Sequence, residues 1–271
     1  MKIARTIREL RALCSELRES APLALVPTLG ALHAGHGALL AAAASSAAVV
    51  ASVFVNPLQF GSPEDIARYP RDEAGDLAFL ERAGCRLAWL PDMDAMYPAD
   101  AATIVDVAGL AQRWEGAHRP GHFRGVATVV AKLFGQVRPE LAFFGEKDWQ
   151  QLQVVRRMVA DLSFPVRVVG VPIVREPDGL ALASRNRFLT PPERAAAPRL
   201  YAAMREAVAA GTGPRALERS RWALQAAGFQ VDYFALVDPE SLAPIAEPPG
   251  RLIAAAQLGS VRLIDNIAAQ L

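Results

Sequence analysis

The sequence is poor in cysteine and has no excess of charge of either sign. Its two cysteines, Cys14 and Cys85, are too few for a disulfide framework and are not spaced as a Cys-x-x-Cys motif. We therefore expect a reducing, intracellular compartment. The 29 lysines and arginines balance 28 aspartates and glutamates, which leaves a net charge of +1. This balance argues against a nucleic-acid partner, which would require a basic surface.

Several other signatures are absent. The sequence has no Gly-x-Ser-x-Gly elbow and no Gly-x-Gly-x-x-Gly fingerprint. Its first eight residues are charged and lack the apolar core of a signal peptide. Residues 37–55 are uncharged and long enough to suggest a membrane span, but they are rich in alanine and serine and end at Asn56-Pro57. We expect a helix and then a buried strand there, and no membrane partner.

Short apolar runs alternate with helical patterns over the first two thirds of the chain. The predicted strands are 23–26, 49–55, 87–90, 141–144 and 166–171, and the predicted helices are 5–19, 36–47, 72–83, 125–137 and 147–161. This alternation indicates an α/β fold with a parallel sheet covered on both faces. Ligands of such sheets bind beyond the carboxyl ends of the strands.

The pattern changes after about residue 175. Helices are predicted over 191–210 and 214–227, with Gly228 as the C-terminal cap, and strands over 231–237, 252–256 and 261–264. With 271 residues, of which 52% are hydrophobic, the chain can form two domains. We predict a larger domain over residues 1–174 and a smaller α+β domain over residues 175–271.

The most informative segment is residues 26–36, Val-Pro-Thr-Leu-Gly-Ala-Leu-His-Ala-Gly-His. An apolar run, a glycine turn and an uncharged alanine-rich stretch are typical of a strand, a tight turn and a helix start. The N–H groups at a helix start attract phosphate, and glycine lets the backbone approach a ligand closely. His33 and His36 add hydrogen-bond donors. The segment therefore predicts a site for the phosphates of a nucleotide.

Three alternatives apply to the same turn. Gly30 and Gly35 are spaced as in a P-loop, but His36-Gly37 stand where that motif has lysine and a hydroxyl residue. His33 and His36 could bind a metal, although no carboxylate lies between them and a third ligand is not evident. The third alternative is a pair of turn histidines with no role. It is weakened because half of the four histidines of the chain lie in this turn.

A second strand end repeats this pattern at residues 143–151. The apolar run ends at Gly145, and a helix begins at Glu146-Lys147-Asp148. A lysine in the first turn opposes the helix dipole unless an anion is bound there. Gln151, four residues after Lys147, shares its helix face. We expect a functional role for this segment, and the alternative is a solvated helix cap.

Three loops add further candidates. Asn56 and Gln59 follow a predicted strand, and their amides suit the hydroxyls and carboxylate of a small substrate, although Asn-Pro is also an ordinary turn signal. Ser184 and Arg185, on a loop that could instead be a plain linker, could bind phosphates and close over the site. The loop 119–126, with its histidine and arginines, could line the site or a subunit contact. A carboxylate substrate would need no enzymatic base, only positive charge and orientation.

Together these segments resemble the pantoate–β-alanine ligase family, also called the pantothenate synthetase family, over essentially the whole chain. The matching segments are 27–36, 53–60, 119–126, 144–151, 184–186 and 262–266. Their joint order is highly specific, whereas the His-x-Gly-His turn alone marks a wider nucleotidyltransferase superfamily.

The resemblance implies a Rossmann-like parallel-sheet domain followed by a smaller α+β C-terminal lid domain, in a cytoplasmic homodimer. It also implies two half-reactions. ATP and pantoate, with Mg²⁺, give pantoyl adenylate and pyrophosphate, and β-alanine then attacks the adenylate to give pantothenate and AMP.

The motif match also implies roles for individual residues. Residues in contact with ATP would be Leu29, Gly30, Ala31, Leu32, His33, Ala34, Gly35, His36, Gly145, Glu146, Lys147, Asp148, Val174, Leu182, Ala183, Ser184 and Arg185. The catalytic residues would be His36, His33, Lys147, Ser184 and Arg185. Among these, His36 would be a proton donor and Lys147 would contact the phosphates. Gln59 would bind pantoate and lie near β-alanine, and Gln151 would bind pantoate. The match names no metal ligands.

The sequence departs from the family pattern at three positions. Leu29 and Leu58 replace methionines, and these swaps conserve volume and apolar character. Ala183 replaces the first serine of the usual Ser-Ser-Arg-Asn motif, which removes one hydroxyl donor. If that hydroxyl contacts a phosphate, its loss would cost ~1 kcal/mol or more.

Two alternative functions stay open from the sequence. A nucleotidylyltransferase of the same superfamily would retain AMP on its product. A non-catalytic ATP-binding regulator would bind ATP without turnover, but binding alone does not require leaving-group residues such as Lys147, Ser184 and Arg185.

Overall fold

The computed structural model describes residues 1–61, 66–67 and 69–270, which form two compact units. The first unit consists of Met1–Glu146 and Gln151–Pro172, and the second of Lys147–Gln150 and Ile173–Leu271. The short segment Lys147–Gln150 therefore belongs to a different unit from the residues on either side of it along the chain.

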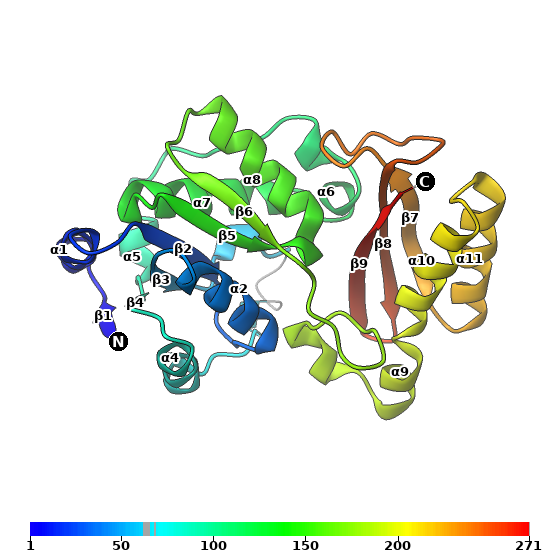
Figure 1. The fold of residues 1–271 in the computed structure, drawn as a ribbon, viewed down its shortest axis with the longest axis horizontal. Coiled ribbons are helices and arrows are strands. Elements are labelled where there is room, and N and C mark those ends of the chain that lie inside the picture. The colour runs from blue at the N-terminus through cyan, green and yellow to red at the C-terminus, as the bar shows by residue number, and fades with distance from the viewer. Residues whose placement is uncertain (62–65, 68, 271) are drawn as a thin grey trace. The chain divides into compact units, whose positions relative to one another are not determined.

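The described part of the first unit contains a six-stranded parallel sheet in the order β1-β4-β3-β2-β5-β6 (Figure 1). Its strands are β1 (Lys2–Ala4), β2 (Leu23–Thr28), β3 (Ala48–Val53), β4 (Leu87–Trp89), β5 (Leu141–Gly145) and β6 (Arg167–Val171). The sheet confirms the predicted α/β class. The short edge strand β1, which has two exposed residues, was not predicted because it lacks an apolar run.

The chain order reverses in the middle of this sheet. From β2 the chain proceeds outward through β3 and β4, and from β5 it proceeds in the other direction to β6. Parallel sheets bind ligands at the carboxyl ends of the strands where the order reverses. The turns that follow β2 and β5 therefore lie at the expected binding position.

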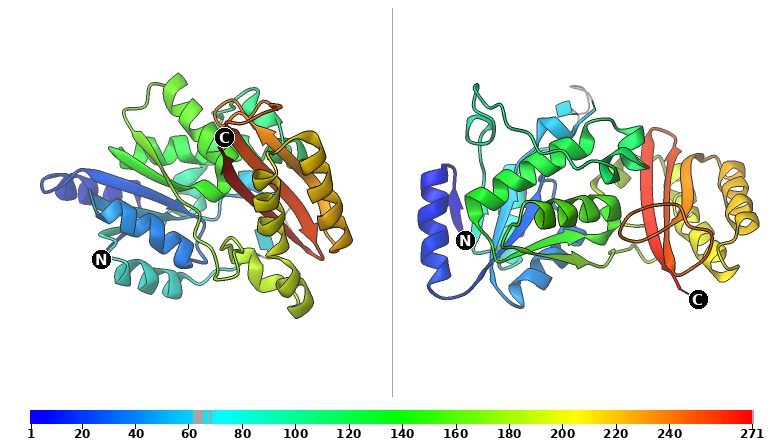
Figure 2. Two further views of the ribbon diagram at one scale, coloured as in Figure 1. Left: turned by 45° about the vertical axis from the view of Figure 1, so that its right-hand side comes forward. Right: turned by 90° about the horizontal axis from the view of Figure 1, so that it is seen from above.

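Helices cover both faces of this sheet (Figure 2). Ala24 and Val26 of β2 pack in one core cluster with Leu39 and Leu40 of α2 (Ala34–Ala44). Side chains alternate along a strand, so the buried Leu25 points to the opposite face.

The structure describes six further helices in the first unit, some of which begin at a recognisable side-chain cap. They are α1 (Ile7–Arg18), α4 (Glu73–Arg82), α5 (Met93–Met96), α6 (Glu115–His118), α7 (His122–Val137) and α8 (Trp149–Asp161), the last beginning with residues of the second unit. For example, Thr6 and Glu9 form a capping box that starts α1. Within the described ranges, no helix combines the length and the apolar character needed to cross a bilayer.

The second unit, as described, is built on a three-stranded antiparallel sheet of β7 (Gln230–Val237), β8 (Gly250–Leu258) and β9 (Val261–Ala269). Helices α10 (Arg199–Ala209) and α11 (Pro214–Ala226) pack on it (Figure 2). Their Met204 and Leu224 share a buried cluster with Phe234 and Leu252 of the sheet. This small α+β arrangement agrees with the predicted elements.

One predicted helix is divided in two. The sequence pattern predicts a continuous helix over 191–210, but α9 (Pro191–Ala196) ends before α10 begins at Arg199. Pro198 caps α10 between them. Ala197 and Pro198 keep helical dihedral angles, but Pro198 has no N–H to donate to the carbonyl four residues earlier, and this missing hydrogen bond interrupts the helix.

Both cysteines are buried inside the first unit. Cys14 is 1% exposed and Cys85 is 4% exposed. Burial raises the pKa of the Cys14 thiol to about 11, and burial also raises the pKa of Cys85. Because only the thiolate is an effective nucleophile, both side chains should be unreactive in the folded protein.

We predict that neither thiol reacts readily with iodoacetamide at pH 8 in the native protein, and that both react after unfolding in guanidinium. The raised pKa of Cys14 also predicts how the free energy of unfolding changes with pH. The folded protein keeps this proton while the unfolded chain releases it, so the contribution of Cys14 to the free energy of unfolding falls between about pH 9 and pH 11. Rapid labelling of one thiol under native conditions would contradict the buried assignment.

Candidate active site

The turn after β2 has a backbone conformation that depends on glycine. Gly30 has a φ of +84°, and a Cβ atom there would lie 2.7 Å from Oδ2 of Asp76. The next residue, Ala31, is also left-handed, with a φ of +52°. The chain thus reverses sharply between the end of the strand and the start of α2 at Ala34.

A buried carboxylate holds this turn. Asp76, on α4, is 5% exposed, and its two oxygens accept hydrogen bonds from the backbone N–H groups of Ala31 (3.0 Å) and Leu32 (2.8 Å). The Tyr69 hydroxyl donates to the carbonyl of Gly30 at 3.3 Å. Sequence analysis missed Asp76, although its spacing of four residues from the buried Leu80 places it on the core face of its helix.

The two histidines of the turn cap α2. Nδ1 of His33 accepts a hydrogen bond from the N–H of Gly35 (3.1 Å), and Nδ1 of His36 accepts one from the N–H of His33 (3.2 Å). Their ring centroids are 4.2 Å apart. A ring nitrogen that accepts a hydrogen bond has no proton, so each neutral ring has its proton on Nε2. The turn therefore holds both imidazole rings at a helix N-terminus.

The turn after β3 is organised by a buried amide. Asn56 is fully buried, and its Nδ2 donates to Oε1 of Gln59 and to the carbonyl of Gly125, both at 3.0 Å. Its Oδ1 accepts from the Tyr97 hydroxyl at 2.8 Å. Burial raises the pKa of the Tyr97 phenol, so this donor keeps its proton. Asn56 is thus a support for Gln59, which is the more exposed of the two amides.

The loop that precedes α7 supports the same residue. Arg119 Nη2 (3.1 Å) and His122 Nδ1 (2.8 Å) both donate to the carbonyl of Gln59. A Cβ atom on Gly125 would lie 2.2 Å from the carbonyl oxygen of Leu58, so only glycine lets α7 approach this closely. Arg119 and His122 therefore fix the position of Gln59.

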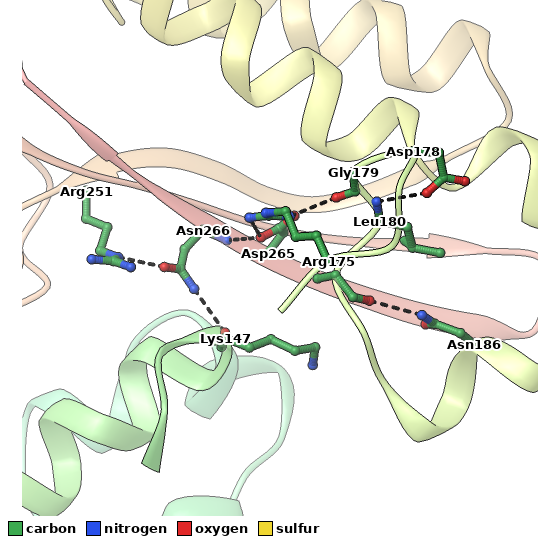
Figure 3. Close-up of polar contacts among 10 residues, drawn as sticks. Lys147, Arg175, Asp178, Gly179, Leu180, Asn186, Arg251, Asp265 and Asn266 are labelled. Atoms are coloured by element: carbon green, nitrogen blue, oxygen red, sulfur yellow. Dashed lines mark hydrogen bonds and ion pairs between the residues drawn. The ribbon is translucent and has the colours of Figure 1, made fainter. Parts of the chain in front are cut away.

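The third turn follows β5. The strand ends at Gly145, and a short 3-10 helix, Glu146–Asp148, leads into α8. The carbonyl of Lys147 accepts a hydrogen bond from Nδ2 of Asn266 at 3.0 Å (Figure 3). Gln151 is partly buried in the first unit.

The fourth segment is a hairpin followed by a short helix. The N–H of Leu182 donates to the carbonyl of Val174 at 3.0 Å. Ala183 is the N-cap of the 3-10 helix Ser184–Phe188 and provides no side-chain hydrogen bond, as expected when alanine replaces serine. Ser184 is partly exposed and Arg185 is exposed, so both are accessible in the second unit.

The predicted site residues thus fall into one group in each unit. In the first unit, the turns after β2, β3 and β5 are brought to one edge of the sheet because these strands are parallel neighbours. This group comprises Leu29, Gly30, Ala31, Leu32, His33, Ala34, Gly35, His36, Gln59, Gly145, Glu146 and Gln151. The group in the second unit comprises Lys147, Asp148, Val174, Leu182, Ala183, Ser184 and Arg185.

Comparison with known proteins identifies the family. The family model described as pantoate-beta-alanine ligase matches residues 2–268. Pantothenate synthetase of Granulibacter bethesdensis is 58% identical, with 98% of this chain and 96% of the relative covered. That of Acidiphilium cryptum is 54% identical, with 99% and 100% covered.

Solved structures agree with this match. The crystal structure of pantothenate synthetase from Thermus thermophilus has a TM-score of 0.94 and 51% identity, with both chains fully covered. Pantoate-beta-alanine ligase from Francisella tularensis, complexed with beta-gamma ATP and beta-alanine, has a TM-score of 0.86 and 31% identity, with 99% of this chain and 98% of that chain covered.

These relatives do not favour the alternative in which AMP stays on the product, because they are named as ligases that make pantothenate. The match extends over nearly the whole chain and includes both sheets. The chain therefore belongs to the pantoate–β-alanine ligase family.

Proposed function

We propose that this ligase joins pantoate to β-alanine through a pantoyl adenylate, with the predicted residues in the roles implied by the family. The observation that best supports these roles is the pair of histidines at the N-terminus of α2. Their Nδ1 atoms accept hydrogen bonds from backbone N–H groups, so both rings are held at a helix N-terminus, which attracts phosphate. They lie where the strand order reverses, which is the usual binding position of such sheets.

In the first half-reaction, a carboxylate oxygen of pantoate attacks the α-phosphorus of ATP. The bond to the bridging oxygen breaks, and pyrophosphate leaves with the electron pair. We propose that His33 and His36 donate hydrogen bonds to the phosphates, while Lys147, Ser184 and Arg185 stabilise charge on the leaving pyrophosphate. No protein base is needed, because the attacking carboxylate is already ionised.

In the second half-reaction, the amine of β-alanine attacks the acyl carbon of the adenylate. The amide bond forms, the acyl–oxygen bond breaks, and AMP leaves. We propose that Gln59 and Gln151 hold pantoate through both steps. Gln59 is suited to this role because Asn56, Arg119 and His122 already fix its side chain and its carbonyl.

Mg²⁺ prefers oxygen ligands and commonly binds through one or two carboxylates together with substrate phosphates. Among the residues that the structure describes, no group of three or more His, Cys, Asp and Glu could hold a metal ion. Asp76 already accepts a backbone hydrogen bond with each oxygen. The residues present do not fit a resident metal site, and we propose that Mg²⁺ arrives bound to ATP.

The remaining family properties are also part of the proposal. We propose a cytoplasmic homodimer in which residues 175–271 act as a lid, with the domain boundary between residues 174 and 175, two residues after the first unit ends at Pro172. The proposed leaving-group residues Lys147, Ser184 and Arg185 all belong to the second unit, which supports a lid that acts on pyrophosphate.

We predict that the enzyme exchanges labelled pyrophosphate into ATP when pantoate is present, without any need for β-alanine. Adenylation is reversible before β-alanine enters, so exchange reports the first half-reaction alone. Product analysis after addition of β-alanine should then show free AMP and an amide. Exchange in the absence of pantoate would contradict the proposed reaction.

Substitution of the donors tests their roles. His36→Asn keeps a polar side chain that can cap the helix but removes the ring N–H, and Lys147→Ala removes the charge. Each should lower turnover by ~10²-fold or more, as loss of a transition-state donor does. Arg157→Ala is a matched control, because Arg157 pairs with Asp161 on the exposed surface. Near-wild-type turnover in either donor variant would refute the assigned role.

Thermal melts test the origin of the metal. We expect MgCl₂ alone to leave Tm unchanged relative to NaCl of equal ionic strength, whereas ATP with MgCl₂ should raise it, because only a bound ligand stabilises the folded state. A specific rise with MgCl₂ alone would point to a resident metal site and contradict the proposal.

A further inference from the structure

Two adjacent polar residues, Asp265 and Asn266, are buried in the last strand of the second unit. Asp265 is 5% exposed and Asn266 is 3% exposed. Buried polar side chains in a sheet are costly unless they are hydrogen-bonded, so their partners indicate what they do. Consecutive side chains of a strand point to opposite faces, and these two hold different parts of the unit.

Asn266 holds the segment that contains Lys147. Its Oδ1 accepts from Nε of Arg251 (2.6 Å), and its Nδ2 donates to the carbonyl of Lys147 (3.0 Å), as Figure 3 shows. The guanidinium of Arg251 also stacks on the ring of Trp149, 3.4 Å from its centroid. The indole N–H of Trp149 donates to the carbonyl of Pro239 at 2.8 Å. The segment Lys147–Gln150 is therefore attached to the three-stranded sheet at two points.

Asp265 holds the hairpin that precedes Ser184 and Arg185. Both of its oxygens accept from Arg175, at 2.6 and 2.8 Å, and Arg175 also donates to the carbonyl of Gly179 at 3.0 Å (Figure 3). The hairpin is closed by the bridge between Arg175 and Ala181. Asn186, in the helix Ser184–Phe188, donates to the carbonyl of Ala181 at 3.0 Å. The helix of Ser184 is thus linked through the hairpin to Asp265.

The two contacts are also linked to each other. The N–H of Asn266 donates to Oδ1 of Asp265 at 2.7 Å, so the same carboxylate oxygen that faces Arg175 is fixed by the neighbouring backbone. A displacement of β9 would therefore move the carbonyl of Lys147 and the Arg175 hairpin together.

We propose that Asp265 and Asn266 are positioning residues for the adenylation step. They hold Lys147 and the helix of Ser184 and Arg185 on one rigid strand, and so set the spacing of the groups that receive pyrophosphate. This inference rests on the proposed function, which assigns those three residues to the leaving group. Preorganised donors lose much of their effect when displaced, and a shift of about 1 Å can cost about 10²-fold in rate. The aminolysis step releases no pyrophosphate and does not need this spacing.

The test is the variant Asn266→Asp. It keeps size and the acceptor for Arg251, whose cation compensates the new charge, but it removes the donor to the carbonyl of Lys147. Pantoate-dependent pyrophosphate exchange should fall about tenfold or more, whereas aminolysis of supplied pantoyl adenylate should stay within about twofold. Asp232→Asn is a matched control, because it removes the negative charge from the Arg262–Asp232 pair (2.7 Å) between β9 and β7. It should leave the ratio of the two rates unchanged.

A double-mutant cycle separates positioning from general stability. If Asn266 acts through Lys147, Asn266→Asp should change exchange by less than about twofold in a Lys147→Ala background. Equal losses in both half-reactions, or full additivity with Lys147→Ala, would overturn the proposal.

A second variant covers the case in which Asn266→Asp does not fold. Arg175→Lys keeps the charge beside Asp265 but cannot bond both of its oxygens and Gly179 together, so it should show the same selective loss of exchange. Wild-type ratios of exchange to aminolysis in both folded variants would refute only the positioning role. Absence of pantoate-dependent exchange in the wild type would instead refute the proposed function.

Discussion

The first unit depends on how the unpaired backbone N–H groups between β2 and α2 are satisfied. A strand that ends at the edge of a parallel sheet and turns at once into a helix leaves several donors without partners. Asp76 accepts two of them, and the rings of His33 and His36 accept two more. The hydrogen bonds to Nδ1 also fix each ring at the N-terminus of α2. The contacts that satisfy the backbone N–H groups therefore also fix the two rings that we propose as donors to phosphate.

In the second unit, loops that have little secondary structure of their own are held in place by contacts with the three-stranded sheet. The segment 147–150, the hairpin 174–182 and the helix Ser184–Phe188 are short and contain exposed or partly exposed polar residues. Their positions are set by side-chain hydrogen bonds to a regular sheet, through Arg175, Arg251 and Asn266. A rigid sheet that carries polar side chains where these short loops contact it therefore gives the loops a defined geometry.

Much of the fold could be predicted from the sequence, because the strands 23–28, 48–53 and 141–145 are apolar runs with clear ends. The turn after β2 was recognisable because its glycines and histidines lie close together in the sequence. The supporting contacts were not, since Asp76 and Leu32 are 44 residues apart and Asn266 and Lys147 are 119 apart. Periodicity reports which face of an element is buried, but it does not report which partner a buried polar group meets. The break at Pro198 was predictable in principle from proline chemistry alone.

The assignment of Lys147–Gln150 to the second unit has a consequence for how the chain can be divided. The polypeptide passes between the units after Glu146, after Gln150 and after Pro172. A fragment that stops at residue 172 would keep Trp149 but lose the Arg251 that stacks on it, and the complementary fragment would keep Asn266 without the carbonyl that it binds. The two units therefore cannot be separated by a single cut in the chain. Exchange of the C-terminal region between relatives would require exchange of the segment 147–150 as well.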